Sequence, residues 1–160
     1  MERSGSGPVL DPNVVEFIHG GVAVGVATRD DDLRPEFARA WGPEVSADGR
    51  SLTLCVTAPE GSRMRANLER NGAVAVGFSP PTIARAVQLK GVASRVREPQ
   101  AADLERVNRH VRSFVAEAER IGAPAELSRR MFVGTGLVAV ELSIDEAFDQ
   151  SPGPTAGRRL

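Results

Sequence analysis

Most of the chain consists of short runs in which apolar residues, chiefly Val, Ala and Leu, alternate with polar ones. A period of two is the pattern of a strand with one buried face, because successive side chains point to opposite faces. Clusters of Gly, Pro and Asp separate the runs and favour turns, while Gly91 inside the fifth run indicates a bulge. We therefore predict six strands, at 22–28, 37–41, 51–57, 73–78, 84–96 and 138–144.

Other segments have helical spacing. Leu104, Val107 and Val111 recur at steps of three and four residues with charged residues between them, which predicts a long amphipathic helix. A shorter helix is indicated by Ser62, a good N-cap residue, and by Gly72, which suits the C′ position. We predict helices at 12–19, 62–71 and 99–118, and a helical turn at 126–131.

The order of these elements predicts the fold class. Strands and helices do not alternate regularly along the chain, which argues against a doubly wound parallel sheet. Six short antiparallel strands are enough for a small barrel, so the chain is predicted to be α+β, a six-stranded antiparallel barrel with flanking helices. Residues 1–8 are interpreted as a flexible leader and 9–148 as one domain. The Gly/Pro-rich tail at 149–160 is expected to be either disordered or laid on a partner.

Composition excludes several classes of protein. The 21 acidic and 20 basic residues leave a net charge of −1, so a broad basic surface for nucleic acid is not expected. Cys55 is the sole cysteine, which rules out an internal disulfide, and a buried core position is expected for it. His19 and His110 lie far apart in the sequence, and no metal site is predicted. No apolar run has membrane length, so we expect a soluble, cytoplasmic protein without membrane contact.

The segment from Thr57 to Arg65 is the best candidate for ligand chemistry. A predicted strand ends there, a Gly-containing loop follows, and a helix begins at Ser62. The first amides of a helix lack internal partners and carry partial positive charge. Together with the Ser62 hydroxyl and the guanidinium groups of Arg63 and Arg65, they would suit a phosphate. A capped surface helix with solvated arginines is the alternative interpretation.

Lys90 is the only lysine in a chain that has 19 arginines. It lies in a predicted strand, and Gln88 shares its strand face because of the period of two. An ammonium group differs chemically from a guanidinium fork, so this position is a candidate for a specific contact. An ordinary strand residue with a solvated head group is the alternative.

Three segments resemble a known family. The stretch at 62–71 resembles the phosphate-binding segment of the pyridoxamine 5′-phosphate oxidase-like, FMN-binding split-barrel family. The runs at 74–78 and 84–91 resemble that family's next two strands. The resemblance extends over about residues 9–148 and implies a split-barrel homodimer with one FMN per subunit, bound at the dimer interface.

The resemblance also implies which residues would hold the cofactor phosphate. Ser62 and Arg63 match the family's phosphate-binding Ser and Arg. The family's Lys falls on Met64, so that cation is missing, and Arg65 is the implied substitute one position on.

The remaining implied contacts concern the flavin ring. The family's strand-end Thr falls on Ala58, with Thr57 beside it. The family's strand Gln falls on Ala86, and Gln88 or Lys90 on the same strand face is implied near the pyrimidine edge of the ring. Arg39 takes the place of an Arg on the second strand.

The function implied is that of an FMN-binding protein acting as a flavin-dependent oxidoreductase. The oxidase's own C-terminal Arg-x-x-His signature is not found in the final residues Arg158-Arg159-Leu160, so another member of the family is implied. Two alternatives stay open. One is a non-catalytic carrier or sensor of flavin, deazaflavin or haem, and the other is a cofactor-free dimer that acts as an interaction module.

Overall fold

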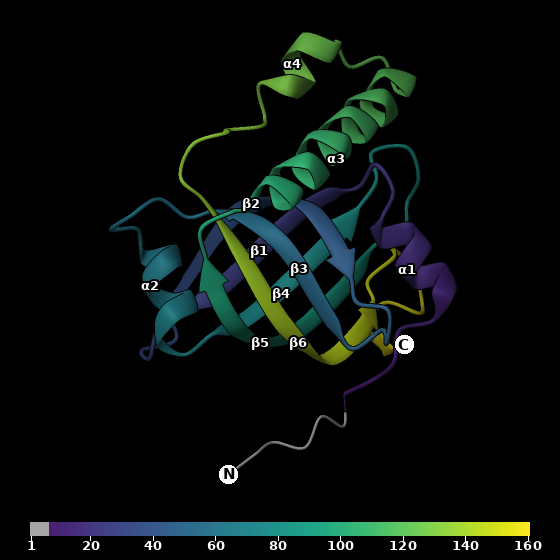
Figure 1. Cartoon of the computed structure of the whole chain (residues 1–160). Coiled ribbons are helices and arrows are strands. Elements are labelled where there is room, and N and C mark those ends of the chain that lie inside the picture. Colours follow the sequence, from purple (N-terminus) through teal and green to yellow (C-terminus); the bar gives the residue numbers. More distant parts are fainter. Residues whose placement is uncertain (1–6) are drawn as a thin grey trace.

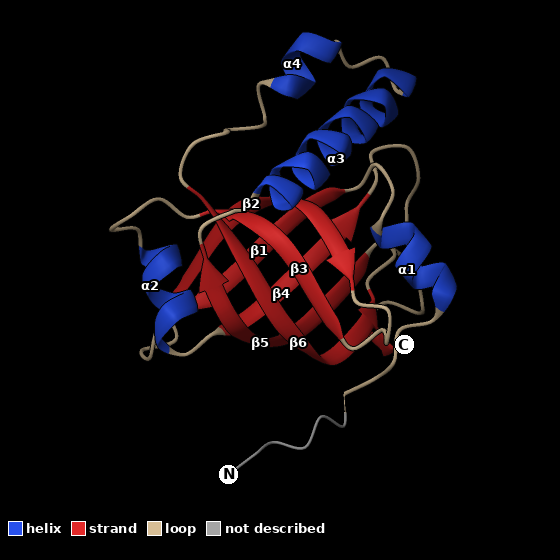
Figure 2. Ribbon diagram, in the orientation of Figure 1, coloured by secondary structure: helices blue, strands red, loops and turns tan. Residues whose placement is uncertain are grey.

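The computed structural model describes residues 7–160 and contains a closed antiparallel barrel (Figures 1 and 2). The strand order is β3-β2-β1-β4-β5-β6, a further pairing of β3 with β6 closes the ring, and β7 continues from β6. The predicted α+β class and six-stranded barrel are thereby confirmed. The strands are β1 (Ala23–Arg29), β2 (Pro35–Val45), β3 (Ser51–Thr57), β4 (Ala73–Ser79), β5 (Val87–Arg97), β6 (Leu137–Asp149) and β7 (Arg158–Arg159).

Four helices within residues 7–160 surround the barrel. Helices α1 and α2 lie at opposite ends of it, α3 crosses its side over β2 and β3, and α4 lies beyond α3 (Figure 1). Within residues 7–160, no helix has both the length and the apolar character needed to cross a membrane. The helices are α1 (Pro12–Ile18), α2 (Arg63–Arg70), α3 (Ala101–Arg120) and α4 (Ala125–Arg129).

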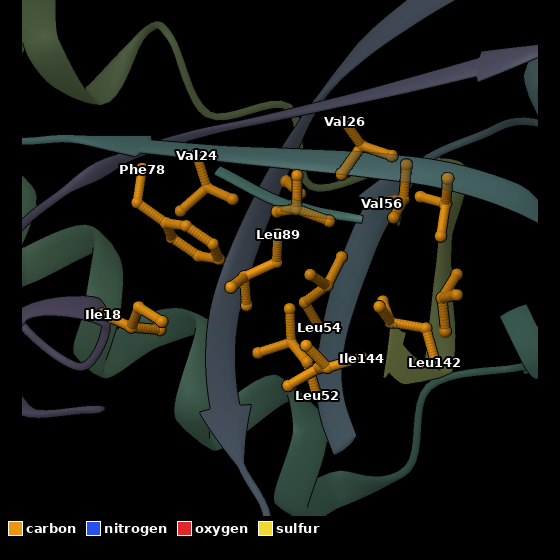
Figure 3. Packing of buried hydrophobic residues seen from close by; sticks show 14 of the residues in the cluster. Ile18, Val24, Val26, Leu52, Leu54, Val56, Phe78, Leu89, Leu142 and Ile144 are labelled. Atoms are coloured by element: carbon orange, nitrogen blue, oxygen red, sulfur yellow. The ribbon is translucent and has the colours of Figure 1, made fainter. Parts of the chain in front are cut away.

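The interior of the barrel is filled by the apolar residues whose alternation predicts the strands. Val26, Leu54 and Phe78 come from three different strands and point toward one another (Figure 3). Ile18 of α1 and Leu68 of α2 extend the same core at the two ends. Each buried side chain of this size stabilises the fold by about 1.5–3 kcal/mol relative to an exposed one. Burial of this single core therefore positions both end helices.

A second, smaller core lies outside the barrel, between β2, β3, β6 and α3. Trp41, Cys55 and Phe114 belong to it. Cys55 is fully buried, as expected, and desolvation raises the pKa of its thiol to about 11. This second core holds α3 against the barrel.

Three strand boundaries differ from the predictions by three residues or more. Strand β2 continues past residue 41 to Val45 because a bulge at Gly42 turns the chain and lets pairing with β3 resume. Strand β6 extends to Asp149, which allows it to pair with both β3 and β5 and close the barrel. Strand β5 begins at Val87 instead of residue 84. A bulge lies beside Gly91 as predicted, but the extra residue is Asp145 on β6 and not a residue of β5; a Cβ on Gly91 would lie 1.7 Å from the Ser143 carbonyl oxygen.

The C-terminal segment folds back on its own chain. Arg158 and Arg159 form β7 and pair with Asp149 and Phe148 of β6. The expectation of disorder is therefore wrong for these two residues, because the end of β6 beyond Ser143, which β3 leaves unpaired, accepts them. The alternative of an arm on a partner stays a prediction. The leader interpreted at 1–8 lies, for residues 1–6, outside the described residues.

Candidate functional site

Helix α2 begins as predicted. The Ser62 side chain caps it by accepting a hydrogen bond from the Arg65 amide at 3.2 Å. The amides of Arg63 and Met64 precede any acceptor inside the helix, so they are available to an anion. This end of α2 therefore has the backbone geometry of an anion site.

Arg63 is the accessible cation at this helix end. Its side chain is 71% exposed, and Nε lies 2.9 Å from Oε2 of Glu36 on β2. Exposed ion pairs of this kind are weak, typically 0–1 kcal/mol, because water competes for both groups. Arg63 can therefore exchange its carboxylate partner for another anion.

Arg65 faces another way. Residues two apart on a helix do not share a face, and Arg65 reaches Glu69 at 3.0 Å and Glu98, beyond β5, at 3.2 Å. The hydrogen bond that Arg65 donates to Glu69 is the main cause that raises the pKa of Arg65 above its ordinary value. The structure therefore does not bring Arg63 and Arg65 together as one clamp.

Met64 points inward from the same turn. It is buried, and its sulfur accepts a hydrogen bond from the Thr28 hydroxyl at 3.5 Å. Asn67 donates to that hydroxyl at 3.1 Å, so the three residues close this end of the barrel. The position at which the resembled family has Lys is thus part of the core here.

A flat floor lies on the outer face of β1 and β4. In the strand register Gly25 and Gly77 are paired, as are Ala27 and Ala75, and all four alternate with buried valines or Phe78. A groove of about 420 Å³ runs over part of this floor. Because these residues have at most a Cβ, a planar molecule could approach the backbone closely, except at Gly25, which the Phe37 ring covers. We call the four residues the outer floor.

Three predicted site residues border the outer floor. Arg39 of β2 is paired with Gly25 on one side, and Gln88 of β5 with Gly77 on the other. Lys90 is paired with Ala75 and lines the groove. Antiparallel strands lie about 4.8 Å apart, so Arg39 and Gln88 are separated by about 14 Å across three strand spacings.

Thr57 stands at the edge of the same arrangement. It ends β3 opposite Leu137, directly after the pair formed by Val56 and Ala40, so it lies on the Arg39 side of the outer floor. Ala58, where the family's Thr falls, is fully buried. Thr57 is therefore the hydroxyl that this strand end presents.

Sequence reasoning missed several neighbours of these residues. Phe37 is 65% exposed and its ring covers Gly25, where a Cβ would lie 2.6 Å from the ring. Phe148 of β6 lies under the ammonium of Lys90, 5.2 Å from ring centroid to Nζ. Phe37 and Arg39 alternate with Ala38 and Ala40 in the sequence, which could have indicated that Phe37 lies on the same face of β2 as Arg39.

The two parts of the site meet on β2. Glu36, the partner of Arg63, directly precedes Phe37, which covers the floor. The start of α2 and the outer floor therefore both adjoin the first residues of β2, although Glu36 and Phe37 point to opposite faces of the strand.

No protein-family model matches the sequence, and no curated protein is similar to it. Solved structures are similar in fold. An F420 reductase has a TM-score of 0.56 at 16% identity, with coverage of 82% of this chain and 93% of that one. A putative pyridoxamine 5′-phosphate oxidase from Lactobacillus delbrueckii has 0.53 at 20% identity, with coverage of 87% and 93%.

An FMN-binding protein from Syntrophomonas wolfei has a TM-score of 0.52 at 11% identity, with coverage of 88% of both chains. These identities are low, so the likeness concerns the fold. The structural neighbours are pyridoxamine 5′-phosphate oxidase-like, FMN-binding split-barrel proteins, and this chain has their fold.

Proposed function

We propose that this protein binds FMN, with the phosphate at the start of α2 and the ring over the outer floor. The observation that carries the proposal is that β2 contacts both parts: Glu36 holds the exposed Arg63 of α2, and the next residue, Phe37, borders the outer floor of small residues. The split-barrel neighbours described as FMN-binding or as a pyridoxamine 5′-phosphate oxidase support it at the level of the fold.

The residues present fit this cofactor in part. Ser62 and Arg63 would hold the phosphate, since a hydroxyl, a guanidinium and free helix amides all favour an anion. Met64 supplies no cation because its thioether is uncharged, and it is buried, while Arg65 is engaged by Glu69 and Glu98. The phosphate contact would therefore depend more on Arg63 than the family resemblance implies.

The borders of the floor would orient the ring. Gln88 and Lys90 would donate to its polar edge from β5, while Arg39 and Thr57 would contact it from β2 and β3. When bound, FMN supplies hydride transfer, and the protein supplies binding, orientation and electrostatics. A flavin-dependent oxidoreductase is thus the function we propose, and a homodimer that covers the outer floor with a second copy is its expected state.

The proposal is tested first by flavin binding. Purified protein is stripped of any bound cofactor and titrated with FMN and with riboflavin, which lacks the phosphate. We expect saturable quenching of flavin fluorescence with both ligands and tighter binding of FMN. Absence of saturable binding of either flavin would refute the proposal.

The dimer is tested separately by changing Phe37. Replacement of this exposed ring by a carboxylate, Phe37→Asp, places charge beside the outer floor and should shift the protein toward a monomeric mass in light scattering. Leu127→Asp on α4, where Leu127 is 60% exposed, is the matched control and should leave the mass unchanged. A monomeric mass for the unmodified protein would contradict the dimer.

A deazaflavin is the second candidate ligand. The neighbour described as an F420 reductase favours it, and its TM-score of 0.56 is at least as high as those of the FMN-related neighbours above. A deazaflavin cofactor in the same titration separates the two, since the proposal requires FMN to bind more tightly.

A further inference from the structure

Glu36 and Arg63 form an ion pair whose two side chains differ in solvent exposure. Glu36 belongs to β2, where it is paired with Thr28 of β1, and its side chain is only 29% exposed. Arg63 is the first residue of α2 and is 71% exposed. The carboxylate is thus anchored on the barrel, whereas the guanidinium extends into solvent.

The position of this carboxylate matters because it is an anion at an anion site. Glu36 occupies only the Nε edge of the Arg63 guanidinium, so it blocks the bidentate phosphate contact that would use this edge. A phosphate that approaches the start of α2 therefore meets Arg63 already engaged through Nε. After displacement, Glu36 stays near the phosphate, and like charges at short range repel each other.

We propose that Glu36 is an internal competitor for the phosphate of the ligand. It occupies Arg63 in the free protein, lowers the affinity for phosphorylated ligands, and leaves the affinity for the non-phosphorylated ring unaffected. Glu36 thus sets how strongly this site distinguishes FMN from riboflavin. The inference rests on the proposed function, because it assumes that the phosphate binds at Arg63.

The test is Glu36→Gln, which keeps the size of the side chain and removes its charge. The dissociation constants of FMN and riboflavin are measured for both proteins by fluorescence quenching at low salt. We expect FMN to bind about fivefold more tightly to the variant, the upper range for one exposed ion pair, and riboflavin to bind equally to both.

The matched control is Glu126→Gln on α4. Glu126 also pairs with an exposed arginine, Arg130, at 2.8 Å, and its replacement changes the net charge by the same amount. Helix α4 lies beyond α3, away from α2 (Figure 1). This variant should bind both flavins as the unmodified protein does, and an equal gain in FMN affinity would reduce the Glu36 effect to net charge and overturn the inference.

A second background isolates the proposed mechanism. In Arg63→Gln protein there is no guanidinium to compete for, so the added Glu36→Gln change should give a much smaller gain than in the unmodified background. An equal gain in FMN affinity without Arg63 would contradict the proposed competition between Glu36 and the phosphate for this guanidinium.

The outcomes separate this inference from the function on which it rests. Unchanged or weaker FMN binding by Glu36→Gln, with normal binding by the unmodified protein, overturns the inference alone. Failure of both flavins to bind any of the proteins refutes the proposed function as well. An unchanged melting temperature of the variant shows that the fold is retained.

Discussion

Helices α2 and α3 both contact the barrel, but their polar groups are placed in opposite ways. The polar groups by which α3 contacts the barrel are largely buried and satisfied by the protein itself. Those at the start of α2 are exposed and joined by contacts that an external anion could replace. The difference separates charges that hold the fold from charges that are available for binding.

His110 shows the α3 arrangement most clearly. Its Nδ1 accepts a hydrogen bond from the Gly42 amide at 3.1 Å, and its Nε2 lies 2.8 Å from the Val22 carbonyl oxygen. A carbonyl only accepts, so the neutral ring carries its proton on Nε2. Gly42 has φ +63, and a Cβ there would lie 2.9 Å from the Val107 amide nitrogen. The bulge thus allows close approach and directs the amide toward His110.

Asp103 holds the first turn of α3. Its side chain is 3% exposed and accepts from Arg97, from Arg106 and from the Gln100 amide. The hydrogen bond from Arg97 is the main cause that holds the pKa of this carboxyl well below its usual range. The ionised Asp103 carboxylate therefore stabilises the fold fully at a pH above its pKa in the unfolded chain, about 3.9. This stabilisation is lost as the pH falls through the lower pKa that the carboxyl has in the folded protein.

The largest expected effect belongs to Asp103. Asp103→Ala leaves two partly buried guanidinium groups short of a partner, and broken buried pairs cost about 3–5 kcal/mol. Arg97 retains Glu141, and Arg106 retains Glu44, so we expect a loss near the lower end, about 3 kcal/mol of unfolding free energy. Urea denaturation measures it, and a loss below 1 kcal/mol, roughly that of an exposed pair, would remove the distinction between the two helices.

The next effect concerns binding at α2. Arg63→Ala should weaken FMN binding by about 1.5–3 kcal/mol, the range for a hydrogen bond to a charged group, with little change in stability. Arg130→Ala is the matched control, because Arg130 is 73% exposed and pairs with Glu126 at 2.8 Å. Equal FMN affinity of the two variants would show that the phosphate does not bind at Arg63.

A smaller effect is expected from the protonation of His110. Desolvation lowers the pKa of this ring, so below about pH 6.5 the unfolded chain takes up a proton before the folded one does. Stability should therefore fall as the pH drops from 6.5 toward the lower folded pKa, by at most about 1.4 kcal/mol per pH unit.

His110→Gln is the variant that tests this pH dependence. It keeps a donor and an acceptor but cannot titrate, so the His110 part of the slope should disappear. Trp41 is the only tryptophan, and its ring centroid lies 5.7 Å from that of His110, so its fluorescence also reports on the ring. An identical slope in the variant would assign the pH dependence to other groups.

The smallest effect is expected for Glu126→Ala on α4. Both members of its ion pair are more than 70% exposed, and such pairs contribute about 0–1 kcal/mol. We expect urea denaturation to show a change of at most about 0.5 kcal/mol. A change near that of Asp103→Ala would show that exposure does not separate the two kinds of pair.

Much of the fold could be predicted from local patterns. The strands around Val24, Leu54 and Val76, the Ser62 cap and the bulge beside Gly91 all follow from alternation and residue type. The continuation of β2 beyond Trp41 could not, because alternation is interrupted at the bulge and the strand resumes only through its partner β3.

The candidate site was less accessible to prediction. Gln88 and Lys90 share a face through strand periodicity alone, but that Arg39 borders the same floor depends on the register of four strands. The competing carboxylate of Glu36 carries no local signal, since it lies 27 positions before Arg63 in the sequence.

By itself, the sequence determined the strands, the caps and the likeness of residues 62–71 to a phosphate-binding segment, because these depend on neighbours along the chain. Only the tertiary structure decided that Met64 is buried and that the side chains of Arg63 and Arg65 point in different directions. It also decided that Glu36 pairs with Arg63. The physical reason is that burial and charge pairing depend on which distant segments the closed barrel brings into contact.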